Sequence, residues 1–270
     1  MPFFDVINPL YAMSGFAVGT IVGLTGVGGG SLMTPLLILL FGVHPATAVG
    51  TDLLYAGLTK TVGTTVHGRS GSVSWRIVGL LASGSVPASA TTLLALHVLG
   101  LRTEATSVLI SFVLGTALLA TAASLALRNR LISLSAAADW ANADETDKES
   151  QRMQAILTVL VGGAVGVLVS VCSVGAGAIG VTALYFLYPH LPAKMIVGSD
   201  IAHAVPLTLI AGSGYWLLGS IDWAMLASLL IGSVPGIIAG SASAPRIPDA
   251  VLRPILAAVL ALVGARLVLA

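Results

Sequence analysis

Ten apolar segments follow one another along the chain, separated by short stretches that are polar or rich in glycine. In the first half they lie at 10–26, 31–43, 46–66, 76–98 and 104–127, and in the second half at 154–173, 177–188, 193–217, 222–244 and 249–269. A helix needs about 20 apolar residues to cross a bilayer. The pattern therefore predicts an all-α integral membrane protein. We expect the first two segments of each half to be short or broken helices that meet at a glycine run.

The two halves carry the same unit. Gly-Thr-Asp at 50–52 recurs as Gly-Ser-Asp at 198–200, and Gly-Ser-Val-Pro at 84–87 recurs unchanged at 232–235. In both pairs the residue numbers differ by 148, so the register holds between the two motifs. A duplicated apolar unit interrupted by Gly and Pro is typical of membrane transporters built from two repeats.

A strongly polar stretch at 128–153 separates the two halves. We therefore divide the chain into a first transmembrane repeat (1–127), a polar cytoplasmic linker (128–153) and a second transmembrane repeat (154–270). Charged residues are scarce in the chain: only 9% of all residues are charged, 56% are hydrophobic and the mean hydropathy is +1.00. Soluble domains have about 25% charged residues. Most of this chain must face lipid or other buried helices.

Basic residues indicate the orientation, since cytoplasmic loops are enriched in Lys and Arg. If each half crosses the membrane five times, only Arg102 falls between spans on one side. The opposite side then carries Arg69, Arg76, Arg128, Arg130, Lys148, Arg152, Lys194, Arg246 and Arg253. With four crossings per half, the same residues divide almost evenly. We therefore expect an inverted repeat, with the linker in the cytoplasm and both termini outside.

The glycine runs are the first candidate for a binding site. Val-Gly-Gly-Gly at 27–30 corresponds to Val-Gly-Ala-Gly at 174–177. Non-helical backbone at membrane depth is tolerated only where protein or a water-filled cavity surrounds it, and the N–H groups at the start of the following half-helix attract anions. Close helix packing is the alternative, but two runs at matching places favour a substrate site. Its candidate residues are Gly28, Gly29, Gly30, Ser31, Thr34, Gly175 and Gly177.

Ionisable residues inside the segments are the second candidate. Asp52 and Asp200 occupy equivalent places, and buried carboxylates in a membrane indicate function unless they only favour the start of a helix. Lys60 lies eight residues after Asp52 and is expected to pair with Asp52 or to neutralise a bound anion. His203 lies three residues after Asp200 on the same helix face. Its expected role is that of a ligand, a proton carrier or a packing residue.

These motifs resemble the TauE/SafE family of membrane proteins, the sulfite exporters or sulfonate-uptake-type permeases. The similar stretches are Gly-Leu-Thr-Gly-Val-Gly-Gly-Gly at 23–30, Pro-Ala-Thr-Ala-Val-Gly-Thr-Asp at 45–52, Val-Gly-Ser-Asp at 197–200 and the two Gly-Ser-Val-Pro sequences. The resemblance covers about 10–270. It implies transport of small anions, often sulfur oxoanions or organosulfonates, by a multi-pass protein of the inner (cytoplasmic) membrane.

We therefore expect a secondary transporter of a small anion, with sulfite, thiosulfate or an organosulfonate as the leading substrates and protons as the candidate coupling ion. An anion channel that uses the same site is one alternative, and an intramembrane hydrolase built on Ser199, Asp200 and His203 is another. The expected partners are the anion and the lipid bilayer. We expect no enzymatic activity, cofactor, metal or nucleic-acid partner, and the sequence leaves the oligomeric state open.

Overall fold

The computed structural model describes residues 7–25, 30–69, 73–100, 103–136, 148–243 and 249–269. Within these residues all regular secondary structure is helical, which confirms the all-α prediction. The helices are α1 (Pro9–Thr25), α2 (Gly30–Phe41), α3 (Pro45–Arg69), α4 (Trp75–Leu99), α5 (Glu104–Ala136), α6 (Lys148–Cys172), α7 (Ala178–Leu187), α8 (Ala193–Leu217), α9 (Trp223–Ser243) and α10 (Asp249–Leu269). Each apolar segment of the sequence corresponds to one helix.

The described helices have the lengths and surfaces of a multi-pass membrane protein. Helices α4, α6, α8 and α9 and the 104–127 part of α5 are long and apolar enough to cross a membrane, whereas α1, α2, α7 and α10 contain shorter apolar stretches. Large apolar side chains such as Leu94, Leu160 and Ile238 are more than half exposed. An exterior of this kind is stable against lipid, whereas soluble proteins rarely expose large continuous apolar surfaces.

One detail of the predicted elements was wrong. Helix α6 has 25 residues and is a full-length helix, although the sequence suggested a short one. Helix α5 continues to Ala136, so both helices extend into the stretch 128–153 that was assigned to the linker. The reason is that hydropathy marks the end of the apolar region, whereas a helix satisfies its own backbone hydrogen bonds and can continue into water.

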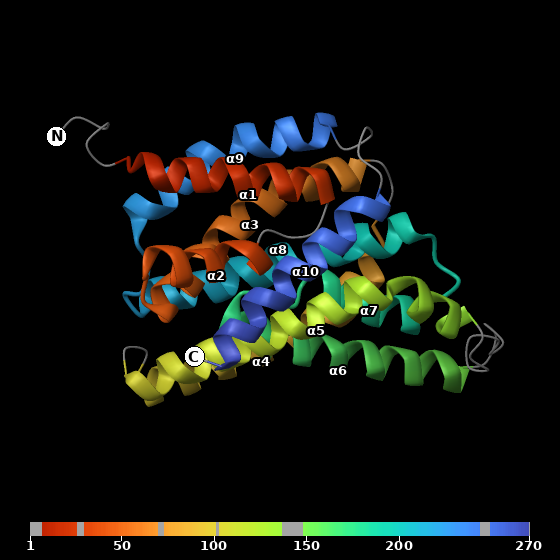
Figure 1. The fold of residues 1–270 in the computed structure, drawn as a ribbon. Coiled ribbons are helices and arrows are strands. Elements are labelled where there is room, and N and C mark those ends of the chain that lie inside the picture. Colours follow the sequence, from red (N-terminus) through yellow and green to blue (C-terminus); the bar gives the residue numbers. More distant parts are fainter. Residues whose placement is uncertain are drawn as a thin grey trace.

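Equivalent helices of the two repeats run in opposite directions (Figure 1). Helices α1 and α5 begin at the end of the bundle where the N-terminus is marked, and their counterparts α6 and α10 begin towards the other end. The start of α1 and the end of α10 therefore share one end of the bundle, while the end of α5 and the start of α6 share the other. These directions agree with an inverted repeat, and both the inversion and the orientation in a membrane stay predictions.

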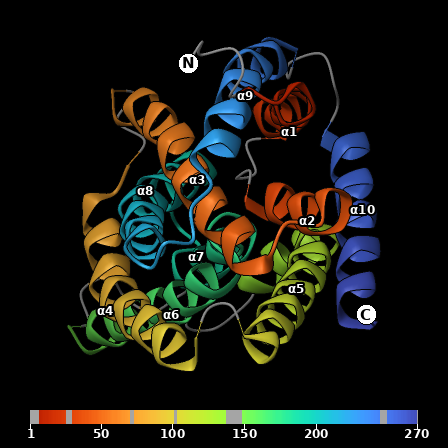
Figure 2. The ribbon, with the colours of Figure 1, turned by 90° about the vertical axis from the view of Figure 1, so that its left-hand side faces the viewer.

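The two repeats interlock through equivalent contacts. Helix α1 packs along α9, and its counterpart α6 packs along α4, which is the counterpart of α9. Helix α3 packs against its own counterpart α8, and α5 packs against α10. Figure 2 shows α3 in the interior, with α1 and α9 on one side and α4 and α6 on another. The central pair α3 and α8 carries the Gly-Thr-Asp and Gly-Ser-Asp motifs.

Glycines bring the outer helix pairs close together. A Cβ atom on Gly84 of α4 would overlap the carbonyl oxygen of Val159 on α6, and a Cβ atom on Gly232 of α9 would overlap that of Ala12 on α1. These two contacts correspond under the duplication. Small residues permit such backbone approach between membrane helices. The first residue of each Gly-Ser-Val-Pro motif is therefore a packing residue.

The hydroxyl groups of the Gly-Thr-Asp and Gly-Ser-Asp motifs reach across to the other repeat. Thr51 Oγ1 accepts a hydrogen bond from the backbone N–H of Asp222 at 3.2 Å, and Ser199 Oγ accepts one from the backbone N–H of Ser74 at 2.9 Å. Asp222 and Ser74 directly precede α9 and α4. The middle residue of each motif thus fixes the start of a helix in the opposite repeat.

Candidate functional site

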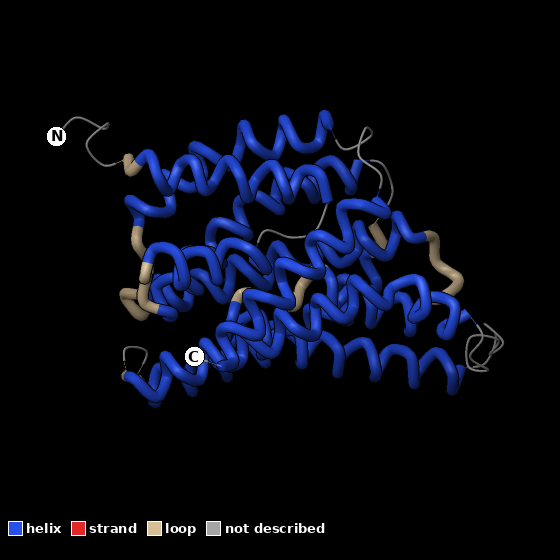
Figure 3. The backbone as a smooth tube through the Cα atoms, viewed as in Figure 1, coloured by secondary structure: helices blue, strands red, loops and turns tan. Residues whose placement is uncertain are grey.

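The glycine break of the second repeat is buried, non-helical backbone. Helix α6 ends at Cys172 and α7 begins at Ala178, with a short loop between them, and the described loops are drawn in tan in Figure 3. Ser173, Gly175 and Gly177 have φ angles of 59°, 127° and 129°. The two glycine values lie where L side chains are strained. Helix α6 ends at Cys172 because the positive φ angle of Ser173 is not helical. Ser173 is nevertheless buried, with 7% of its surface exposed.

The break of the first repeat is only partly described. Helix α1 ends at Thr25 and α2 begins at Gly30. Gly28 and Gly29, two of the predicted site residues, lie outside the described residues. Ser31 follows Gly30 in α2, and its side chain also lies outside the description. The site can therefore be followed from Thr34 onward.

Asp52 lies against the start of α2. Thr34 Oγ1 donates a hydrogen bond to Asp52 Oδ2 at 2.5 Å, and both residues are fully buried. The other carboxylate oxygen, Oδ1, has no hydrogen-bond partner among the described residues. The hydroxyl of Ser173 lies near this carboxylate and also lacks a described partner. Asp52 thus joins the half-helix of its own repeat to the break of the other repeat.

Asp200 occupies the equivalent place against the start of α7. A Cβ atom on Gly180, in the first turn of α7, would overlap Asp200 Oδ1. The N–H of Gly180 donates to the carbonyl of Gly175 at 3.0 Å, which links the first turn to the break. Asp200 is 2% exposed, and its Oδ1 has no hydrogen-bond partner among the described residues. In both repeats the motif Asp therefore contacts the first turns of the half-helix that follows the glycine run.

Lys60 brings the two carboxylates into one electrostatic cluster. This partly buried residue of α3 lies within electrostatic range of both Asp200 and Asp52. It also acts on His203. The sequence suggested Asp52, on the same helix, as a partner of Lys60. Asp200 of the other repeat acts on Lys60 as well, because α3 and α8 pack against each other, and sequence spacing alone cannot show this.

His203 has a partner that the sequence did not indicate. Its Nε2 atom lies 2.8 Å from Oγ of Ser85 on α4, while Nδ1 has no hydrogen-bond partner among the described residues. His203 is 1% exposed. The repeat-equivalent residues are Tyr55 and Ser233, whose buried hydroxyl groups have no described hydrogen-bond partners. The sequence grouped His203 with Asp200, but its hydrogen bond runs to Ser85.

Three residues of this cluster were missed in the sequence. Ser85 is the second residue of a repeated Gly-Ser-Val-Pro motif, so the duplication itself was a usable signal. Ser173 was noticeable only as a departure from the glycine at the equivalent position of the first repeat. Gly180 has no sequence signal of its own, because its importance comes from the approach of Asp200.

The hydroxyl of Ser199, the nucleophile of the hydrolase alternative, takes part in hydrogen bonds with the backbone. The hydroxyl of Ser199 donates to the carbonyl of Met195 at 2.7 Å and accepts from the N–H of Ser74. Ser85 lies close enough to His203 for proton transfer, but a catalytic His also needs an acidic group on its other nitrogen. His203 Nδ1 has no such partner in the described part of the chain.

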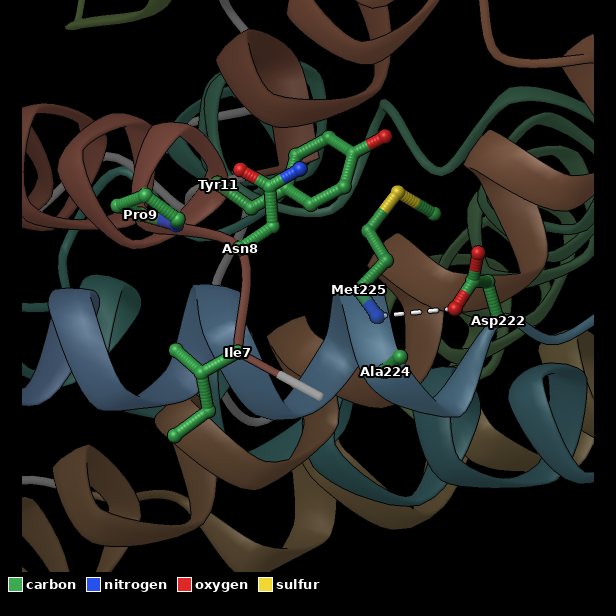
Figure 4. A pocket seen from close by; sticks show the side chains of 7 residues that line it. All are labelled: Ile7, Asn8, Pro9, Tyr11, Asp222, Ala224 and Met225. Atoms are coloured by element: carbon green, nitrogen blue, oxygen red, sulfur yellow. Dashed lines mark hydrogen bonds between the residues drawn. The ribbon is translucent and has the colours of Figure 1, made fainter. Parts of the chain in front are cut away.

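A separate pocket of about 480 Å³ lies beside the starts of α1 and α9 (Figure 4). Asp222 Oδ1 accepts a hydrogen bond from the N–H of Met225 at 2.9 Å, so this carboxylate caps the start of α9. The lining residues are Ile7, Asn8, Pro9, Tyr11, Asp222, Ala224 and Met225. None of the buried ionisable residues described above lines this pocket.

Comparison with known proteins places these features in context. A sequence model of the family described as "Sulfite exporter TauE/SafE" matches residues 11–267. "Probable membrane transporter protein YjnA" of Bacillus subtilis (strain 168) is 36% identical over 256 residues, which cover 95% of this chain and 98% of that protein. "Probable membrane transporter protein YdhB" of the same organism is 25% identical over 88% of this chain and 91% of its own length. A "Probable membrane transporter protein" of Xylella fastidiosa (strain 9a5c) is 28% identical over 83% and 79%, respectively. No solved structure matches the chain.

Proposed function

The chain belongs to the sulfite exporter TauE/SafE family, and from this premise we propose that it is a secondary transporter of a small anion, either a sulfur oxoanion such as sulfite or thiosulfate or an organosulfonate. The full-length similarity to proteins named as probable membrane transporters supports the transporter class. The family name suggests the chemistry of the substrate. The proposal covers the site and its ligand class, not the direction of transport.

One observation carries the proposal: Lys60, Asp52 and Asp200 are ionisable residues on the packed helices α3 and α8 of the two repeats, inside a bundle whose exterior is apolar. Charged residues within membrane segments are costly, and they typically mark the path of an ion or substrate. The Lys60 cluster includes Asp52, Asp200 and His203 and lies where α3 and α8 cross. In transporters built from inverted repeats, the substrate site lies at this kind of repeat interface.

The positive groups of the cluster suit a compact anion. The first turns of α2 and α7 provide partial positive charge, and Lys60 provides a full one. Among its described residues the cluster contains no Arg, which would favour bidentate binding of larger anions. A sulfonate or sulfite group has three oxygens around one sulfur, so it can accept hydrogen bonds from several donors at the same time.

The arrangement of the repeats supports transport by alternating access. Equivalent helices run in opposite directions in Figure 1, and the α1–α9 and α4–α6 pairs are equivalent contacts. Exchanging the conformations of the two repeats would therefore open the same central site to the opposite side. This geometry requires the two repeats to be inverted in the membrane, as the basic loop residues predict.

A ligand panel tests the proposal directly. Purified protein in detergent is heated with sulfite, thiosulfate, sulfate, methanesulfonate or chloride at equal ionic strength. Because a ligand that binds only the folded protein stabilises it, a concentration of 100 times the Kd should add about 2.7 kcal/mol to the free energy of unfolding. We expect at least one sulfur anion to raise the Tm more than chloride does. Folded protein whose Tm is unchanged by every sulfur anion would contradict the proposal.

A matched pair of variants shows whether a shift comes from the proposed site. Lys60→Met removes the positive charge and should reduce the ligand-induced change in Tm. Gly79→Ala lies in α4, where an added methyl group would have no heavy atom within 4 Å, and should keep the full change. An equal response in both variants would place binding elsewhere.

A further inference from the structure

The charges of the buried cluster do not balance. Asp52 and Asp200 contribute two negative charges when ionised, and Lys60 contributes one positive charge. A buried charge without a partner costs several kcal/mol, and a carboxylate in this position commonly avoids the cost by taking up a proton. An incoming anion adds a further negative charge. A site for an anion that contains two carboxylates therefore needs an additional cation.

The two carboxylates are not equally supplied with hydrogen-bond donors. Asp52 accepts a hydrogen bond from Thr34, and the hydroxyl of Ser173 is close to it. Asp200 accepts no hydrogen bond from the described residues, and its Oδ1 is buried without a partner. An ionised carboxylate is stabilised by donors, whereas a protonated one needs fewer of them. Asp200 is thus the better place for a proton.

The titratable neighbours of Asp200 leave Lys60 as its counter-charge. Lys60 on α3 is the charged side chain that acts on Asp200 among the described residues. His203 on the same helix as Asp200 has its Nε2 in contact with Ser85. Tyr55 on α3 and Cys172 at the end of α6 are titratable as well, but the carboxylate that acts on them electrostatically is Asp52, not Asp200. An anion that binds at Lys60 therefore changes the electrostatic environment of the buried Asp200.

We infer that Asp200 carries a proton together with the transported anion, an inference that rests on the proposed anion transport. In the empty site the negative charge of the ionised Asp200 carboxylate offsets the positive charge of Lys60. When an anion binds at Lys60 and takes over this role, Asp200 takes up one proton from the aqueous solution on its unpartnered oxygen. After the site opens to the other side, the anion leaves and Asp200 releases the proton to the solution on that side. One anion and one proton move in the same direction in each cycle.

Proteoliposomes that contain the purified full chain test this coupling. The probes are radiolabelled methanesulfonate and thiosulfate, which keep their charge between about pH 5 and 8, so the substrate's own protonation cannot imitate coupling. Potassium at equal concentration on both sides with valinomycin holds the membrane potential at zero. A gradient of about one pH unit, acidic outside, should then accumulate a transported anion up to about tenfold when one proton accompanies it.

The key variant is Asp200→Asn, which imitates the protonated carboxyl group. It should lose the proton-driven accumulation of up to about tenfold and keep the exchange of labelled for unlabelled anion across the same vesicles. Asp222→Asn is the matched control, since this Asp caps α9 and Asn retains the capping oxygen. It should behave as the wild type in both assays.

The outcomes separate this inference from the proposed function. Anion exchange without any response to the pH gradient would overturn proton coupling and leave anion transport intact. Accumulation that follows a sodium gradient instead of the pH gradient would also overturn proton coupling. Proton-driven accumulation that survives in Asp200→Asn but is lost in His203→Gln would overturn the role of Asp200. Absence of both exchange and accumulation for both probes would overturn the proposed transport of these anions and the coupling with it.

Discussion

Nε2 of His203 lies 2.8 Å from Oγ of Ser85, whereas the hydroxyl groups of the equivalent side chains, Tyr55 and Ser233, lie near each other without a hydrogen bond among the described residues. His203 on α8 corresponds to Tyr55 on α3, and Ser85 on α4 corresponds to Ser233 on α9. One of two equivalent hydrogen bonds is therefore formed and the other is not. A transporter in which the repeats alternate between two conformations would exchange these states, so that the Tyr55–Ser233 contact forms when the His203–Ser85 contact breaks.

This asymmetry predicts unequal effects of two matched substitutions. Ser85→Ala leaves a buried His nitrogen without a partner and should reduce the free energy of unfolding by about 1–3 kcal/mol. Ser233→Ala removes a hydroxyl that makes no hydrogen bond here, and should change it by no more than about 0.5 kcal/mol. Unfolding of the purified variants in detergent measures both. Equal losses would show that the two contacts are equally formed in solution.

The glycines at the outer helix contacts give a second prediction. Gly84→Ala and Gly232→Ala place a methyl group against the backbone of α6 and α1, which cannot move without separating the helices. Each variant should lose at least about 1–3 kcal/mol of the free energy of unfolding, which is the usual cost of overpacking. The yield of monodisperse protein and its Tm measure the effect.

Gly79→Ala is the control on the same helix as Gly84, because the added methyl group meets no other atom. It should be neutral or stabilising by up to about 1 kcal/mol, since Ala favours a helix over Gly. A variant at position 84 or 232 with the stability of the control would show that these helix pairs are not in close contact.

The charge of Lys60 gives a third prediction. Lys60→Met should weaken anion binding by about 1–3 kcal/mol, the scale of a hydrogen bond to a charged group. In the absence of ligand it also leaves Asp200 without its counter-charge, so the double variant Lys60→Met/Asp200→Asn should be more stable than Lys60→Met alone. Coupling of at least about 0.5 kcal/mol in the double-mutant cycle is expected. Strictly additive effects on stability would show that the two side chains do not interact.

The direction of the helices leads to a fourth prediction. The end of α5 and the start of α6 lie at one end of the bundle, and the ends nearest the two termini lie at the other. Because the basic loop residues favour the first of these ends as cytoplasmic, a reporter fused at Ala270 should report a position outside the cytoplasm. A fusion at Ala270 that is active only in the cytoplasm would contradict the predicted orientation.

Much of the fold could be predicted from the sequence because in a membrane an apolar segment must become a helix. All ten apolar segments matched helices among the described residues, and the short segments at 31–43 and 177–188 correspond to the short helices α2 and α7. The ends of two helices could not be predicted from hydropathy, since Ala136 and Lys148 belong to helices that continue beyond the apolar region into the predicted linker 128–153.

The site was harder to predict because its partners come from different repeats. The duplication pointed to Asp52 and Asp200, but it could not show that Lys60 of the first repeat acts on Asp200 of the second. The role of Ser85 was also hidden, since Gly-Ser-Val-Pro was interpreted as a kink and its hydroxyl contacts a helix that is more than 100 positions away. Such contacts depend on which helices cross, and hydropathy does not determine that.

Uptake of radiolabelled sulfur anions into proteoliposomes is the measurement that tests the central claim most directly. The account predicts saturable uptake of thiosulfate or methanesulfonate that is faster than in protein-free vesicles, is inhibited by unlabelled sulfite and is lost in Lys60→Met but retained in Gly79→Ala. Folded, reconstituted wild-type protein that gives no uptake of any sulfur oxoanion or sulfonate above the protein-free vesicles would contradict it.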